Sequence, residues 1–216
     1  DASVWIYPEV GDLQASTYSS ICESDVLINL GTGSQIIFPS LPLSKVLPYF
    51  RYYAGNLKSV PVISHVPCGR LLADYVTAKA VSFSTLRETM NQLDPSDLLT
   101  LDQTLEQTLL CFPGFSFLDL SYHQQPTTSL DKLVLLSTYE FLSIWVLQYY
   151  RILSNYLVDH PMRPNGIMVD VVGDLGGLSY GFTSILARLL QAHFQFRRRA
   201  SVTLPQSLLR FHQASQ

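Results

Sequence analysis

The strongest constraint on the fold is a pair of apolar runs separated by a glycine-rich turn. The segment Asp25–Leu30 is rich in Val, Leu and Ile, and Gly31-Thr32-Gly33-Ser34 follows it directly. A second apolar run, 35–38, comes next. Two β-prone runs joined by a short glycine-rich loop predict a β-hairpin, because glycine tolerates the backbone conformations that tight turns require.

A second glycine cluster follows a different apolar run. Residues 166–172 read Gly-Ile-Met-Val-Asp-Val-Val, then Gly173-Asp174-Leu175-Gly176-Gly177, and helical patterning covers 179–194. Strands that alternate with helices in this way predict an α/β fold with a mixed sheet flanked by helices. The other expected strands are 4–7, 49–53 and 60–63, and the other expected helices are 12–22, 69–80, one or two within 82–108 that start at Ser84 and Ser96, and 132–159.

Composition excludes several classes of protein. With 47% hydrophobic and 14% charged residues, the chain has a large buried core and is not disordered. Its net charge of −3 gives no electrostatic reason to expect nucleic acid as a partner. The cluster Arg197-Arg198-Arg199 is interpreted as a solvated helix end or tail in preference to a site for a phosphate backbone. We therefore expect one domain over 1–196 and a weakly patterned tail over 197–216.

Neither a metal site nor a membrane segment is expected. The three cysteines are an odd number, and neither they nor the five histidines have the spacing of metal ligands. A zinc site and disulfides are therefore not predicted, and we expect a reducing, cytoplasmic setting. The most apolar stretch, Leu133–Val158, contains Glu140 and Arg151, which favours a buried helix over a membrane span. The chain begins without Met and without a signal-peptide pattern, so we expect that it starts within a longer protein.

Three glycine-containing segments are candidates for chemistry, and each also has a purely structural interpretation. Asp12 is a candidate proton acceptor, although helix N-caps favour Asp equally. The Gly31–Ser34 turn can present backbone donors and the Thr32 hydroxyl to phosphate, or be an ordinary hairpin turn. The 173–177 turn lacks the P-loop and dinucleotide-binding spacings. Taken singly, the structural interpretation is the better supported in all three cases.

The order of these segments matches one family. Gly-Asp-Leu-Gln-Ala-Ser at 11–16, followed by Leu-Ile-Asn-Leu-Gly-Thr-Gly-Ser-Gln-Ile at 27–36, resembles the start of the second lobe in FGGY carbohydrate kinases. Pro48-Tyr49-Phe50 with Gly55, and then Pro67-Cys68-Gly69-Arg70-Leu71-Leu72, are similar to sedoheptulokinase-like members. The resemblance covers roughly residues 4–195 and is strongest at the start.

The resemblance implies an actin-like (ribonuclease H-like) ATPase lobe and ATP-dependent phosphorylation of a sugar hydroxyl, with a sedoheptulose-like ketose as substrate and ATP and Mg²⁺ required. It implies that Asp12 is the catalytic base and that Gln14 contacts the sugar. It assigns nucleotide binding to the two glycine turns, through Gly31, Thr32, Gly33, Gly173, Gly176, Gly177 and Ser179.

It also implies that a first lobe, which carries most sugar contacts, is not part of these residues. This chain alone is therefore expected to be inactive and to expose an apolar surface that favours self-association or pairing with that lobe. Departures from the family pattern at Pro113–Phe117 and at Gly181 leave an alternative open. That alternative is a degenerate, non-catalytic lobe that binds nucleotide or a protein partner.

Overall fold

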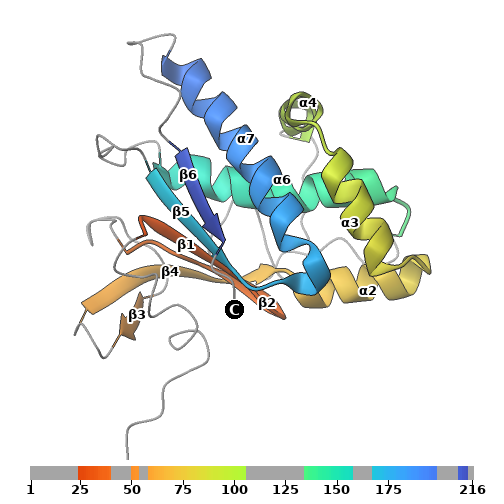
Figure 1. Ribbon diagram of the computed structural model, residues 1–216, viewed down its shortest axis with the longest axis horizontal. Helices are drawn as coiled ribbons and strands as arrows, with labels where there is room; N and C mark the ends of the chain where they lie inside the picture. The colour runs from red at the N-terminus through yellow and green to blue at the C-terminus, as the bar shows by residue number, and fades with distance from the viewer. Residues whose placement is uncertain are drawn as a thin grey trace, which may run out of the picture.

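The computed structural model describes residues 24–39, 50–53, 58–105, 134–157, 167–198 and 209–213. These residues form a mixed six-stranded sheet in the order β3-β4-β2-β1-β5-β6 (Figure 1). The strands are β1 Val26–Leu30, β2 Gly33–Ile37, β3 Phe50–Tyr53, β4 Lys58–Pro67, β5 Ile167–Val172 and β6 Leu209–Gln213. The expected α/β class, a mixed sheet flanked by helices, is confirmed. The expected strand 4–7 and the helix 12–22 lie outside the described residues.

The hairpin expected from the first glycine turn is present. β1 and β2 pair antiparallel, with Leu27 opposite Ile37 and Leu30 opposite Ser34. β5 lies on the other side of β1 and pairs with it in parallel, so that Asn29 is opposite Val172. Because β1 and β5 run in the same direction and end in register, both strands deliver the chain to the same edge of the sheet.

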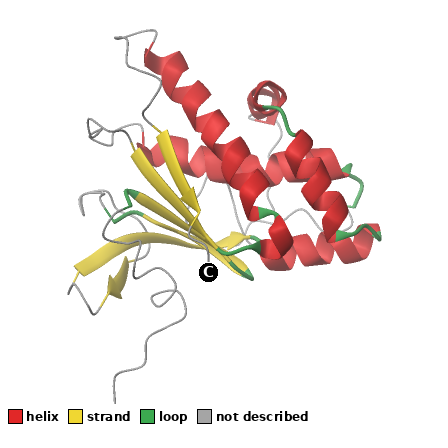
Figure 2. Ribbon diagram, viewed as in Figure 1, coloured by secondary structure: helices red, strands yellow, loops and turns green. Residues whose placement is uncertain are grey.

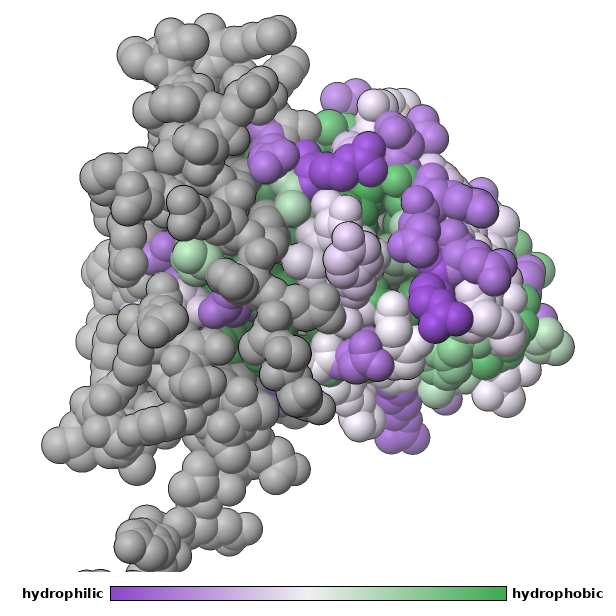
Figure 3. Space-filling view, viewed as in Figure 1, coloured by the Kyte–Doolittle hydropathy of each residue, from purple (hydrophilic) through white to green (hydrophobic). Residues whose placement is uncertain are grey.

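Helices pack on one face of this sheet, as Figure 2 shows for the described part of the chain. They are α2 Gly69–Lys79, α3 Phe83–Gln92, α4 Pro95–Leu105, α6 Thr138–Leu157 and α7 Ser179–Arg198, with the 3₁₀ turn η2 Leu175–Gly177 ahead of α7. In the space-filling view the side chains over these helices are mixed, with polar groups interrupting small apolar areas (Figure 3). None of the described helices combines the length and the hydropathy that a transmembrane segment needs.

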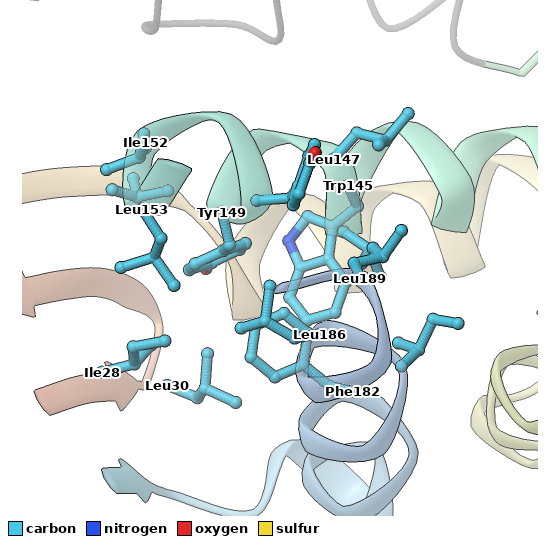
Figure 4. Packing of buried hydrophobic residues seen from close by; sticks show 14 of the residues in the cluster. Ile28, Leu30, Trp145, Leu147, Tyr149, Ile152, Leu153, Phe182, Leu186 and Leu189 are labelled. Carbon is cyan, nitrogen blue, oxygen red and sulfur yellow. The ribbon is translucent and has the colours of Figure 1, made fainter. Parts of the chain in front are cut away.

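An aromatic cluster holds α6 and α7 against the sheet (Figure 4). The ring centroids of Trp145 and Tyr149 are 5.5 Å apart, and Phe182 of α7 lies 5.0 Å from Trp145 and 4.9 Å from Tyr149. Edge-to-face and tilted aromatic pairs of this kind add about 0.5–1.5 kcal/mol each beyond the area that they bury. Trp145 Nε1 also donates to the carbonyl oxygen of Pro67 (3.0 Å), which ties α6 to the end of β4.

The opposite face of the sheet is buried as well. Side chains that alternate with those of the main core form a second apolar cluster, made of Leu27, Ile37, Val60, Val62 and Val172. Burial on both faces explains why β1 and β5 are near-continuous apolar runs instead of alternating ones.

Several helix starts differ from the sequence-based expectation, and capping explains the differences. The long helix begins at Thr138 and not at 132, because Ser137 and Glu140 form a reciprocal capping box: Glu140 N donates to Ser137 Oγ (3.2 Å) and Ser137 N to Glu140 Oε2 (2.8 Å). The cap of α3 is Ser82 instead of Ser84, since Thr85 N donates to Ser82 Oγ (3.1 Å). Ahead of α4, Asp94 Oδ1 accepts from Ser96 N (2.8 Å), so Asp94 has the capping role expected of Ser96.

The C-terminal part contains a strand that was not expected. β6 pairs in parallel with β5, with Ile167 opposite Leu209 and Val171 opposite Gln213. A segment with a weak local pattern can still complete a sheet, because the neighbouring strand supplies its hydrogen-bond partners.

Candidate functional site

Three backbone turns meet at the edge of the sheet where β1 and β5 end. They are the hairpin turn Gly31–Gly33, the entry to α2 at Cys68–Arg70, and the glycine turn Gly173–Gly177. The first two meet because β2 pairs with β4, which places Gly33 opposite Pro67. The structure therefore brings together the two glycine turns that the sequence analysis singled out, although about 140 residues separate them in the chain.

The hairpin turn is held in place by the first residues of α2. Gly69 N donates to the carbonyl oxygen of Gly31 (3.0 Å), and Arg70 N donates to that of Thr32 (2.9 Å). These bonds satisfy two of the N–H groups that a helix start leaves without an internal partner. The carbonyl side of the turn is thus fixed, while Thr32 and Gly33 themselves are exposed. A Cβ atom placed on Gly33 would find no atom within 4 Å, so this part of the turn faces open space.

Gly173 allows the glycine turn to approach the end of β1 closely. Its φ is +98°, and a Cβ atom there would lie 2.1 Å from the carbonyl oxygen of Leu30. No side chain fits at that distance. Glycine is therefore required at this position both for its backbone conformation and for the close approach of the two turns.

Leu175 connects the glycine turn to α2. A Cβ atom on Gly69 would lie 3.1 Å from Leu175 Cδ2 and 2.6 Å from the carbonyl oxygen of Gly31, so Gly69 is enclosed between the two turns. Leu175 has a φ of 47°, and Gly176 and Gly177 follow at 67° and 85°. A non-glycine residue in this region costs about 1–3 kcal/mol, and such strain is concentrated at functional sites.

The side chain of Asp174 caps the glycine turn. Asp174 Oδ2 accepts from Gly177 N (3.1 Å), and Asp174 Oδ1 accepts from Ser179 Oγ (3.4 Å). Ser179 is only 1% exposed. Its hydroxyl therefore lies against Asp174 beneath the turn, whereas the backbone of Gly176 lies on the surface.

Two side chains that the sequence analysis missed lie against this turn. A Cβ atom on Gly176 would be 3.5 Å from Phe83 Cδ1, and one on Gly177 would be 3.2 Å from Arg87 Nη1. Phe83 and Arg87 are one helical turn apart on α3 and both are exposed. Their i, i+4 spacing places them on one helix face, but no local sequence pattern indicates that this face borders the glycine turn.

Buried polar groups lie directly beneath the turns. Burial raises the pKa of Cys68 to about 11, partly opposed by hydrogen bonding to Tyr149 and to the backbone of Gly69 and Gly31. Burial also raises the pKa of Tyr149 well above its ordinary value, and the neighbouring Cys68 raises it further. Both groups are therefore protonated at neutral pH, and neither can act as a base or a nucleophile there.

Gly181, in the first turns of α7, packs against α3. A Cβ atom on it would lie 2.7 Å from Met90 Cγ and 2.9 Å from Asn91 Oδ1. The close contact of α7 with α3 thus explains why glycine occupies this position. The candidate residues Asp12 and Gln14, and the segment Pro113–Phe117, lie outside the described residues.

The two glycine turns together suit a ligand that lies along their exposed backbone. Open α/β sheets bind ligands at the carboxyl ends of their parallel strands, and both glycine turns lie at that end of β1 and β5. Within the described ranges, no three His, Cys, Asp or Glu side chains are grouped as metal ligands. Comparison with known proteins adds no assignment: no family model, curated protein or solved structure gives a significant match to the chain.

Proposed function

We propose that this chain is the nucleotide-binding lobe of an ATP-dependent carbohydrate kinase of the FGGY type, with an actin-like fold. One observation supports the proposal above the others. The hairpin turn and the glycine turn, which the family resemblance assigns to phosphates and to adenosine, lie side by side at one edge of the sheet. Their meeting is a requirement of that assignment, because one nucleotide has to reach both turns.

The hairpin turn is the part suited to phosphate. Thr32 and Gly33 are exposed, and the space beside Gly33 is open. A nucleotide's phosphates would lie against the backbone N–H groups and the Thr32 hydroxyl, which are uncharged donors of the kind found in anion-binding nests. Mg²⁺ would be carried mainly by the phosphates and by water, as is usual for this ion in phosphoryl-transfer sites. It would neutralise charge on the transferred group.

The glycine turn is the part suited to adenosine. The turn has positive φ values at Leu175, Gly176 and Gly177. The two glycines present peptide backbone without side chains of their own. The hydrogen bond from the Ser179 hydroxyl to Asp174 would hold the turn in shape.

The catalytic residues of the parent enzyme come from the first segment of the resemblance. Asp12 would accept the proton from the primary hydroxyl of a ketose, and Gln14 would contact the sugar. Positioning and charge stabilisation account for most of such catalysis.

A second candidate function is a lobe that binds nucleotide or a protein partner without turnover. The packing around Gly181 favours it, because Met90 and Asn91 leave no room for the Asn that the family often carries there. Under this alternative the nucleotide site is retained, while the catalytic reaction is not.

The proposal is tested by measuring nucleotide binding and sugar-dependent ADP release on the same preparation. We expect residues 1–216 to bind MgATP weakly and to release no ADP above background with a ketose, because one lobe leaves the phosphates solvated. Addition of the first lobe, as a separate chain or in the parent protein, should produce turnover. If this chain binds neither ATP nor ADP, the proposal is contradicted. Turnover by the chain alone at about 1–100 s⁻¹, a normal kinase rate, would contradict the half-site account.

A further inference from the structure

Most of the Lys and Arg side chains that the structure describes have a polar partner. Arg151 and Arg188 each lie within ion-pair distance of an aspartate, and Lys79 Nζ donates to a backbone carbonyl oxygen. The other two, Arg70 and Arg87, are exposed, and neither side chain has a hydrogen bond or an ion pair within the described ranges. Arg70 lies at the hairpin turn and Arg87 at the glycine turn.

Arg70 is held next to the hairpin turn by its backbone. Its N–H group donates to the carbonyl oxygen of Thr32 (2.9 Å), so the turn lies directly ahead of the first residues of α2 (Figure 1). The Cα–Cβ bonds of an α-helix tilt toward its N-terminus. Gly69 follows this rule, since a Cβ atom on it would lie 2.6 Å from the carbonyl oxygen of Gly31. The side chain of Arg70 therefore starts in the direction of the turn, and its length allows the guanidinium group to reach a ligand bound there.

The hairpin turn itself offers phosphate only uncharged donors, namely backbone N–H groups and the Thr32 hydroxyl. MgATP keeps a net negative charge after Mg²⁺ has bound, so a cation beside these donors would stabilise the complex through charge-assisted hydrogen bonds. Room for a phosphate is present, because a Cβ atom on Gly33 would meet no atom within 4 Å, those of Arg70 included. Arg70 thus borders the turn without filling the position of the ligand.

We propose that Arg70 binds the polyphosphate chain of the nucleotide at the hairpin turn and supplies the positive charge that the turn does not have. The inference rests on the proposed nucleotide site and adds to it a residue that the family resemblance did not assign. A guanidinium group presents a fixed fork of N–H donors that matches two phosphate oxygens at once, and it stays charged at every physiological pH. Substitution of the side chain leaves the N–H group of Arg70 in place, so its role can be tested without releasing the turn from α2.

The experiment compares two ligands on matched variants of the 216-residue chain. MgATP and inorganic tripolyphosphate with Mg²⁺ are titrated by NMR chemical-shift changes, which report weak affinities. Arg70→Ala removes the guanidinium group at the hairpin turn, and Arg70→Lys keeps the charge without the fork. Arg188→Ala is the matched control, because it removes one exposed positive charge farther along α7. Thermal unfolding of each variant checks that the fold is retained.

We expect Arg70→Ala to weaken the binding of MgATP and of tripolyphosphate alike, by about 5- to 10-fold, the range of one charge-assisted hydrogen bond at an exposed site. Arg70→Lys should recover most of the loss, and Arg188→Ala should match the unaltered chain for both ligands.

Three results would overturn the inference while the proposed function stands. They are unchanged MgATP binding by Arg70→Ala, a loss for MgATP without one for tripolyphosphate, which would place Arg70 away from phosphate, and equal losses in Arg70→Ala and Arg188→Ala, which would show only a general effect of net charge. Absence of ATP binding by the unaltered chain would overturn both.

Discussion

The side chain of Leu175 covers Gly69 and closes the junction between the glycine turn and the start of α2. A Cβ atom on Gly69 would lie 3.1 Å from Leu175 Cδ2 and 2.6 Å from the carbonyl oxygen of Gly31. The second contact is with backbone, which cannot move away without disturbing the hydrogen bond from Gly69 N to the same oxygen.

Substitution of Gly69 by alanine is therefore expected to destabilise the fold. Gly69→Ala should lower the free energy of unfolding by about 1–3 kcal/mol, the usual cost of overpacking. Gly33→Ala is the matched control, since a Cβ there meets nothing within 4 Å, and it should change stability by less than about 1 kcal/mol. Chemical denaturation measures both. Equal stability of the two variants would show that the junction is looser than described.

A negative charge on the hairpin turn should weaken nucleotide binding without affecting the fold. Gly33→Asp places a carboxylate beside the proposed phosphate position, and open space accommodates the side chain. We expect MgATP affinity to fall about 5- to 10-fold, which corresponds to about 1 kcal/mol or slightly more for charges a few ångströms apart in water. Gly33→Asn has the same shape without the charge and should bind within about twofold of the unaltered chain. If the two variants bind equally, phosphate does not lie at this turn.

The proposed catalytic base can be separated from a structural role in the parent enzyme. Asp12→Asn should reduce turnover by at least about 10²-fold, the usual effect of losing a general base, and leave ATP affinity nearly unchanged. A helix N-cap would give the opposite pattern. In that case turnover would persist and the melting temperature would fall by several degrees, since a lost cap costs about 0.5–2 kcal/mol.

The buried thiol of Cys68 should make the fold sensitive to alkaline pH. Burial raises its pKa from 9.0 to about 11, so above pH 9 the unfolded chain loses a proton that the folded chain retains. The contribution of the protonated thiol to the free energy of unfolding is therefore fully present below pH 9. It is lost as the pH rises toward 11, and the loss is on the order of 1–3 kcal/mol. Cys68→Ala should show a smaller decrease than the unaltered chain over this pH window, as measured by denaturant unfolding at each pH. An identical decrease in both proteins would assign the effect to other groups.

Local structure was largely predictable from the amino-acid sequence. The hairpin of β1 and β2 was expected from two apolar runs around Gly31–Ser34, and β5 and α7 from the strand, glycine and helix pattern beginning at 166. The helix starts were less accurate. Ser, Thr and Asp are abundant near 82–97, and only the geometry identifies which of them accepts a hydrogen bond from the next turn.

Contacts between distant segments depended on tertiary structure. Local patterns could not show that β5 lies parallel to β1, that β6 completes the sheet, or that Leu175 reaches Gly69. The residues of α3 that border the glycine turn, Phe83 and Arg87, carry no local signal of proximity to residues about 90 positions away. Periodicity and turn chemistry encode interactions between near neighbours, so the sequence by itself determined the elements and the two glycine turns. Only the tertiary structure decided that the two turns meet. Burial of both sheet faces pairs β1 with β5 in parallel, and this pairing places the ends of the two strands, and the turns that follow them, side by side.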